Sequence, residues 1–282
     1  MAKIGIVTDS TANLPQAALD YWGIRVVSVG VTISNDTYEE GVNITAPQVA
    51  EAMRRKLAVT TSRPPPSVFE EVYRELADEG CKAVISAHLS ADLSGTFESA
   101  RMAADRVKTK VVAVDSRSIS MGLGYGCLAG ARAAANNESL EDVTAAITQT
   151  AARSRVLFYV NSLEYLRRGG RIGAAERWIG SALAVKPILQ LASGRVQPLE
   201  KVRTASKGLA RLAELAGGYA GDQPCSVSVM HLDAESRAIE LATKLRAGLP
   251  QADVSIGELG SVIGVHVGPG TLAAIVSPAA DR

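Results

Sequence analysis

The chain has 282 residues, enough for one large domain or two of ordinary size, and 47% of them are hydrophobic. Aromatic residues make up only 4%, so we expect cores built from aliphatic side chains. The 30 basic and 29 acidic residues nearly cancel, which argues against general binding of nucleic acid or of a membrane surface. Cys81, Cys127 and Cys225 are too few and too far apart for a disulfide framework or a CxxC metal site.

The N-terminus leads directly into an apolar strand pattern, without the basic and apolar segments of a signal peptide. No apolar run approaches the roughly 18 residues that a membrane span requires. Sparse cysteines fit a reducing compartment. We therefore expect a cytoplasmic protein with no membrane span.

The first half alternates short apolar runs with amphipathic segments, which predicts a parallel α/β sheet covered by helices. Thr45 is expected to cap a helix that carries Val49, Met53 and Leu57. Residues 60–66 are expected to form a loop, because consecutive prolines fit neither a helix nor a central strand. Strands are predicted at 4–7, 26–33, 83–86 and 110–114, and helices at 14–21, 67–79, 96–107, 121–136 and 140–154.

The pattern changes after a predicted strand at 155–160. Two apolar runs flank Ser193-Gly194-Arg195, which is typical of a β-hairpin. Mixed strands and helices follow, so we expect an α+β domain with antiparallel pairing. Strands are predicted at 188–192, 196–199, 226–232, 254–256, 262–267 and 272–276, and a helix at 234–247. The predicted domains are 1–158 and 159–282.

Three hydroxyl-rich loops follow predicted parallel strands: Asp9-Ser10-Thr11, Ser90 to Thr96, and Asp115 to Ser118. Ligands bind open parallel sheets at this carboxyl edge, where helix N-termini converge. Capping of the next helix explains any one of these loops. A ligand site explains better why they recur, and Gly95 between two hydroxyls would let backbone approach a ligand.

Two further segments add candidates. Prolines would hold the hydroxyls of Thr61 and Ser62 in place. His266 lies on a predicted strand among glycines, where it is either a core residue or a ligand contact, whereas His88 and His231 are expected to be structural. Basic clusters at 167–171 and 201–204 are solvated faces or contacts for a phosphate or an acidic partner.

Familiar catalytic motifs are absent from the sequence, including a P-loop, a GxSxG elbow and HExxH. A triad of Ser94, His266 and Asp9 has no support in their spacing. Catalysis by the isolated chain is therefore poorly supported.

Eight segments form a recognisable pattern when taken in chain order: Thr8–Thr11, Thr61–Pro64, Leu93–Ala100, Val114–Ser116, Leu163–Ile172, Lys186–Leu189, Lys201–Thr204 and Ile263–Gly270. Together they resemble the DegV family, the fatty-acid-binding subunits of bacterial fatty acid kinase. The resemblance covers essentially the whole chain. One departure is Arg63, where the family often carries glutamine.

The resemblance implies a Rossmann-like N-terminal domain, an α+β C-terminal domain and a fatty acid buried in a tunnel between them. Thr61 and Ser94 would bind its carboxylate, and His266 and Arg203 would lie beside the headgroup. There a separate ATP-dependent kinase would convert it to an acyl phosphate for phospholipid synthesis. No cofactor or metal is expected on this chain, and membrane contact would at most be transient, for lipid exchange. Supporting positions around the headgroup would be Ser62, Gly95, Thr96, Asp9, Ser10 and Ser116.

Two alternatives remain open at this point. One is an autonomous serine-dependent hydrolase or phosphotransferase that uses Ser94 with His266. The other is a lipid-responsive regulatory module that never meets a kinase.

Overall fold

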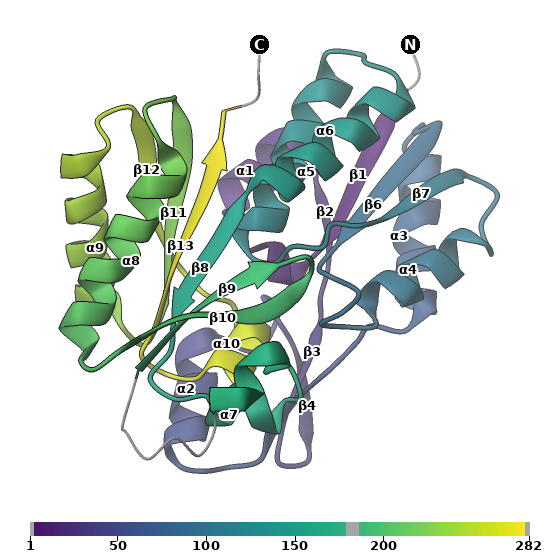
Figure 1. The fold of residues 1–282 in the computed structure, drawn as a ribbon. Coiled ribbons are helices and arrows are strands. Elements are labelled where there is room, and N and C mark those ends of the chain that lie inside the picture. The colour runs from purple at the N-terminus through teal and green to yellow at the C-terminus, as the bar shows by residue number, and fades with distance from the viewer. Residues whose placement is uncertain (1–2, 179–185, 280–282) are drawn as a thin grey trace.

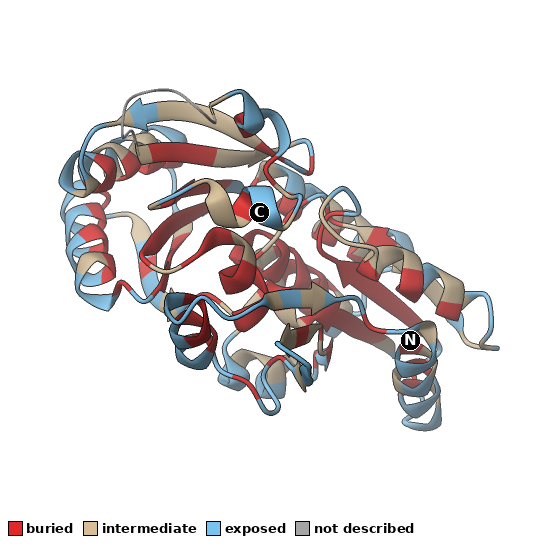
Figure 2. Cartoon of the chain, turned by 90° about the horizontal axis from the view of Figure 1, so that it is seen from below, coloured by how far each residue is buried: buried red, intermediate tan, exposed pale blue. Residues whose placement is uncertain are grey.

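The computed structural model describes residues 3–178 and 186–279 and contains three sheets. Figure 1 shows the parallel sheet of the first half beside the larger sheet of the second half, with a smaller unit below both. Buried residues concentrate in the strands of the two large sheets and on the inner sides of their helices (Figure 2). No helix in the described ranges is long and apolar enough to cross a bilayer.

The first sheet is parallel throughout, as predicted, in the order β2-β1-β6-β7. Alternation along β1 sends Ile6 to one face and Val7 to the other. Ile6 packs with α5 and α6, whereas Val7 packs with α3 and α4. The elements are β1 (Ile4–Asp9), α1 (Gln16–Trp22), β2 (Arg25–Val27), α3 (Pro66–Asp78), β6 (Ala83–His88), α4 (Thr96–Ala104), β7 (Lys110–Asp115), α5 (Met121–Ala135) and α6 (Leu140–Arg153), with a 3-10 turn at Ser10–Ala12.

The second sheet has the order β10-β9-β8-β13-β11-β12, with antiparallel neighbours except for β11 and β12. This mixed pairing confirms the predicted α+β character. Helices α8 and α9 cover one face, and the other face turns toward the first half of the chain. The elements are β8 (Arg155–Tyr159), β9 (Lys186–Ala192), β10 (Arg195–Val202), α8 (Ala205–Ala220), β11 (Cys225–Leu232), α9 (Glu235–Gly248), β12 (Ala252–Glu258) and β13 (Thr271–Pro278). Between β8 and β9 lie α7 (Glu164–Arg168) and a 3-10 segment at Gly173–Trp178.

A third, antiparallel sheet corrects two predictions. The strand expected at 26–33 is two strands, because only β2 joins the parallel sheet while β3 turns away to pair elsewhere. The loop expected at 60–66 begins as a strand, since Thr61 pairs with Val31 before the prolines start at Pro64. This sheet has the order β4-β3-β5 and comprises β3 (Gly30–Ile33), β4 (Asp36–Glu39) and β5 (Val59–Ser62), with α2 (Ala46–Arg54) beside it.

The segment around His266 was predicted as a strand and is a helix, α10 (Ser261–Val267). Its apolar residues are buried on all sides, and such a short run shows no periodicity that separates strand from helix. Gly268 ends the helix with a φ of +80°, which favours glycine. At its start the carboxylate of Glu40 accepts a hydrogen bond of 2.8 Å from the Val262 amide.

The β9–β10 hairpin joins the two halves. Its tip contacts the loops at the carboxyl edge of the parallel sheet, where Ser90 donates to the Gly194 carbonyl at 2.8 Å and Arg117 donates to the Ser193 carbonyl at 2.7 Å. Arg195 adds an ion pair with Asp92. Part of the hydroxyl-rich edge therefore serves docking between the halves.

Candidate ligand-binding site

An apolar cavity of about 200 Å³ lies between the inner face of the six-stranded sheet, the loops of the parallel sheet and α10. Its walls are largely aliphatic, and its polar groups include hydroxyls, two arginines and one histidine. Such a shape suits a ligand with an apolar body and a small polar end. Representative wall residues are Leu93, Ile119, Phe158, Leu191, Ile263 and Ile275.

Thr61 and His266 meet at the polar side of this cavity, although they are far apart in the chain. The Oγ1 of Thr61 on β5 lies 2.9 Å from the Nε2 of His266 on α10. A Cβ at Gly169 would overlap the other ring nitrogen, Nδ1, so only glycine leaves room for the imidazole. Burial, with a smaller contribution from Arg171, lowers the pKa of His266 to about 4. His266 is therefore neutral near pH 7.

Ser94 reaches the cavity from the loop between β6 and α4. Its Oγ lies 2.9 Å from Thr96 Oγ1 and accepts from the Thr96 amide at 3.3 Å. A Cβ at Gly95 would lie 2.6 Å from Arg63 Nη1, so the Arg63 side chain packs across this glycine. The two loops that carry Ser94 and Arg63 are thus in contact at the cavity.

Arg171 also lines the cavity, although in the sequence it is one of several cations in the basic cluster at 167–171. Its Nε donates to the Leu93 carbonyl at 2.9 Å and its Nη1 donates to the Gly169 carbonyl. These two carbonyls fix the guanidinium beside the histidine. The glycine pair before Arg171 was the available signal, because close backbone approach at Gly169 accompanies a buried site.

The predicted site residues divide into two groups. Thr61, Ser62, Ser94, Gly95 and His266 line the cavity. The others lie outside its lining: Thr96 bonds to Ser94, Arg203 is exposed after β10, and Asp9, Ser10 and Ser116 support loops.

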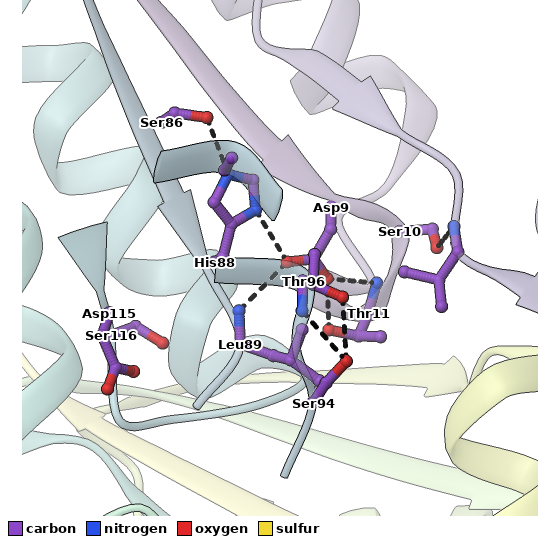
Figure 3. A network of polar contacts seen from close by, with 12 residues as sticks. Asp9, Ser10, Thr11, Ser86, His88, Leu89, Ser94, Thr96, Asp115 and Ser116 are labelled. Atoms are coloured by element: carbon purple, nitrogen blue, oxygen red, sulfur yellow. Dashed lines mark hydrogen bonds and ion pairs between the residues drawn. The ribbon is translucent and has the colours of Figure 1, made fainter. Parts of the chain in front are cut away.

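Asp9 is the centre of a buried network at the ends of β1 and β6 (Figure 3). Its Oδ2 lies 3.0 Å from His88 Nδ1 and accepts from the Leu89 amide at 3.0 Å. The far side of the His88 ring meets Ser86 Oγ at 2.7 Å, and Tyr73 donates to that serine. Every polar atom of the His88 ring is engaged, so this histidine has the structural role predicted for it.

This geometry argues against a serine hydrolase. His266 bonds to Thr61, whereas Ser94 bonds to Thr96. The carboxylate of Asp9 is held by His88. No carboxylate among residues 3–178 and 186–279 hydrogen-bonds to His266, so the nucleophile, base and orienting acid of a triad are not connected there. In the same ranges no cluster of three or more His, Cys, Asp or Glu side chains is placed to hold a metal ion.

Comparisons with known proteins agree with this architecture. The model of the family described as "uncharacterised protein, DegV family" matches residues 3–279. A DegV domain-containing protein of Streptomyces coelicolor is 47% identical over 97% of this chain and 98% of its own. A fatty-acid-binding DegV family protein from Thermus thermophilus superposes with a TM-score of 0.92 at 35% identity, covering 98% of this chain and 100% of that one. DegV of Bacillus subtilis, described as a fatty acid binding protein, gives 0.90 at 32% identity over 99% and 100%. The chain belongs to the DegV family.

Proposed function

We propose that this chain binds a long-chain fatty acid in the cavity and presents its carboxylate to a separate ATP-dependent kinase, which converts it to an acyl phosphate. The observation that carries the proposal is an aliphatic cavity with Thr61, Ser94, Arg171 and His266 among its few polar groups. The fatty-acid-binding descriptions of two structural relatives support the ligand class.

The energetics favour an acyl ligand. Burying ~14 methylenes at ~0.8 kcal/mol each gives up to roughly 11 kcal/mol before the cost of association. One hydrogen bond to a charged group adds only ~1.5–3 kcal/mol. The tail would therefore supply most of the affinity, while the hydroxyls orient the carboxylate and compensate for its lost hydration.

A neutral His266 would allow the Thr61 hydroxyl to donate a hydrogen bond to the ligand carboxylate. When Nε2 carries the imidazole proton it donates to Thr61 Oγ1, which leaves the threonine hydroxyl free to donate to a carboxylate. Arg171, held by two backbone carbonyls, would add a fixed positive charge nearby. The role of Arg203 beside the headgroup stays a prediction from the resemblance, since its side chain lies outside the cavity lining.

Presentation to a second protein fits the chemistry available on this chain. The site has hydroxyl donors and cations but no nucleophile coupled to a base, and the sequence has no P-loop. A phosphoryl transfer would therefore require a partner that supplies the nucleotide. A regulatory module that binds the same lipid is the competing function.

The test uses protein purified from a bacterial host. Native mass spectrometry should show an acyl chain, and the double variant Thr61→Ala/Ser94→Ala should bind fatty acid at least tenfold more weakly and lose turnover by the kinase. The control Ser67→Ala/Thr243→Ala removes two exposed hydroxyls elsewhere and should behave as wild type.

Three results would count against the proposal. A clean apo mass with no binding of added acids contradicts the ligand class. Unchanged turnover of the double variant contradicts the headgroup assignment. Tight lipid binding with no kinase that accepts the complex would favour the regulatory module.

A further inference from the structure

A second, wider cleft lies on the outer side of the Thr61–His266 pair. It shares Thr61, Arg171 and His266 with the apolar cavity, so these residues line both spaces. Its remaining walls come from the end of α2, the turn before β5, α7 and α10. Figure 1 shows α2, α7 and α10 close together beneath the β9–β10 hairpin. The cleft therefore adjoins the place where a carboxylate would bind Thr61.

The cleft is cationic. Lys56 and Arg168 line it together with Arg171, and its one acidic residue is Glu164. Glu164 is already engaged by Arg167 and Arg168, which lower the pKa of its carboxyl to about 2. Lys56 forms no ion pair with any residue in the described ranges. Hydroxyls of Thr60, Ser162 and Tyr165 complete the wall. Such a lining favours an anion with several acceptor oxygens.

The positive charge of the cleft suits the negative charge that phosphorylation would add to the headgroup of the ligand. A fatty-acid carboxylate oxygen would attack the terminal phosphorus of a nucleoside triphosphate held by the kinase, and the bond from that phosphorus to the nucleoside diphosphate would break. The fatty acid gains a phosphoryl group through a new P–O bond, and no proton is taken up. The ligand's headgroup thereby changes from about −1 to about −2 in charge, and gains three acceptor oxygens.

We propose that the outer cleft is a phosphate subsite, in which Lys56 and Arg168 bind the phosphate of the acyl phosphate while Arg171 lies between phosphate and acyl group. This inference rests on the proposed function. The phosphate of the product would contact Lys56 and Arg168, which the carboxylate of the substrate would not reach. This explains why Lys56 and Arg168 lie outside the apolar cavity.

Two probes separate substrate from product. Palmitate carries the carboxylate alone, and the acyl methylenephosphonate of the same chain length replaces the bridging oxygen of the acyl phosphate with a methylene. At low ionic strength we expect Lys56→Ala and Arg168→Ala each to weaken phosphonate binding about three- to tenfold, with less than a twofold change for palmitate. Added salt should shrink the effect, because the cations are exposed.

Neighbouring arginines provide matched controls. Arg55 directly precedes Lys56 in the chain, and Arg167 shares Glu164 with Arg168. Arg55 and Arg167 do not line the cleft. Arg55→Ala and Arg167→Ala should leave phosphonate affinity within twofold of wild type. Lys56→Arg should retain most of it.

The outcomes are distinct. If palmitate binds but phosphonate affinity is unchanged in Lys56→Ala and Arg168→Ala, the subsite is wrong while the proposed function stands. Equal losses in the control variants would also overturn it, because they would reflect net charge alone. If palmitate fails to bind the wild-type chain, the proposed function itself falls, and this inference falls with it.

Discussion

The end of β1 at the carboxyl edge of the parallel sheet and the small β4-β3-β5 sheet both present polar side chains near the centre of the molecule, but these side chains have different roles. At the end of β1, the side chains of Asp9 and Ser10 accept hydrogen bonds from backbone amides and so hold the backbone in place. From the small sheet, Thr61 meets a histidine at the wall of an apolar cavity. Hydroxyls at strand ends therefore indicate a site only when they face a space that a ligand can fill.

The largest effect that tests this comparison is expected at Asp9. Asp9→Ala would leave the Nδ1 of His88 and the amide of Leu89 buried without their hydrogen-bond partner. We therefore expect a loss of roughly 3 kcal/mol or more in the free energy of unfolding. Urea unfolding measures it. Asp92→Ala removes an exposed ion pair with Arg195 and should cost far less. Equal losses would show that the Asp9 network has no special structural role.

Gly169→Ala tests the other region. A Cβ there would overlap Nδ1 of His266, so the imidazole must move away from Thr61, at a cost of about 1–3 kcal/mol in stability. Fatty-acid affinity, measured by calorimetry, should fall as well. Gly217 on α8 is the control, because a Cβ added there meets no atom within 4 Å. Gly217→Ala should stabilise the chain by about 0.5–1 kcal/mol. Unchanged lipid affinity in Gly169→Ala would contradict a role for His266 in binding the headgroup.

The pH dependence of His266 gives an effect that appears only as the pH falls below 7. Its folded pKa of about 4 lies below the ordinary value of 6.5, so the unfolded chain takes up the proton first as pH falls. Stability from the neutral ring is therefore present above pH 6.5 and is lost as pH falls from there toward 4, by an amount of order 1–3 kcal/mol. Urea unfolding at pH 7 and pH 5 should show a smaller difference in His266→Gln than in wild type. The same difference in both proteins would contradict the depressed pKa.

Local sequence patterns predicted most strands of the parallel sheet correctly. Runs such as Ile4–Asp9 and Ala83–His88 are apolar, short and followed by polar turns, and each became a parallel strand. The small sheet was missed because its pairing, Val31 with Thr61, joins segments thirty residues apart in the chain, which local patterns do not connect. The helix around His266 was missed because complete burial removes the polar positions that would reveal its period.

The site shows the same division. Thr61, Ser94 and His266 were identified through motifs, and the structure places all three at one cavity. Arg171 and Arg203 could not be ranked from the chain, because both lie in basic clusters and only tertiary packing puts one guanidinium against the cavity and leaves the other exposed. The wall residues were equally hidden, since an aliphatic side chain that lines a cavity looks in sequence like one that fills a core.

Because the cavity lies among buried side chains of both halves, a bound ligand would change the stability of the fold. Phe158 and Ile275 belong to a hydrophobic cluster and also line the cavity, so an acyl tail would add to that cluster as a further packed element. By mass action, a ligand at a hundred times its Kd adds about 2.7 kcal/mol to the free energy of unfolding. A carrier built in this way would be most resistant to heat and proteolysis when loaded, and its melting temperature would report its occupancy.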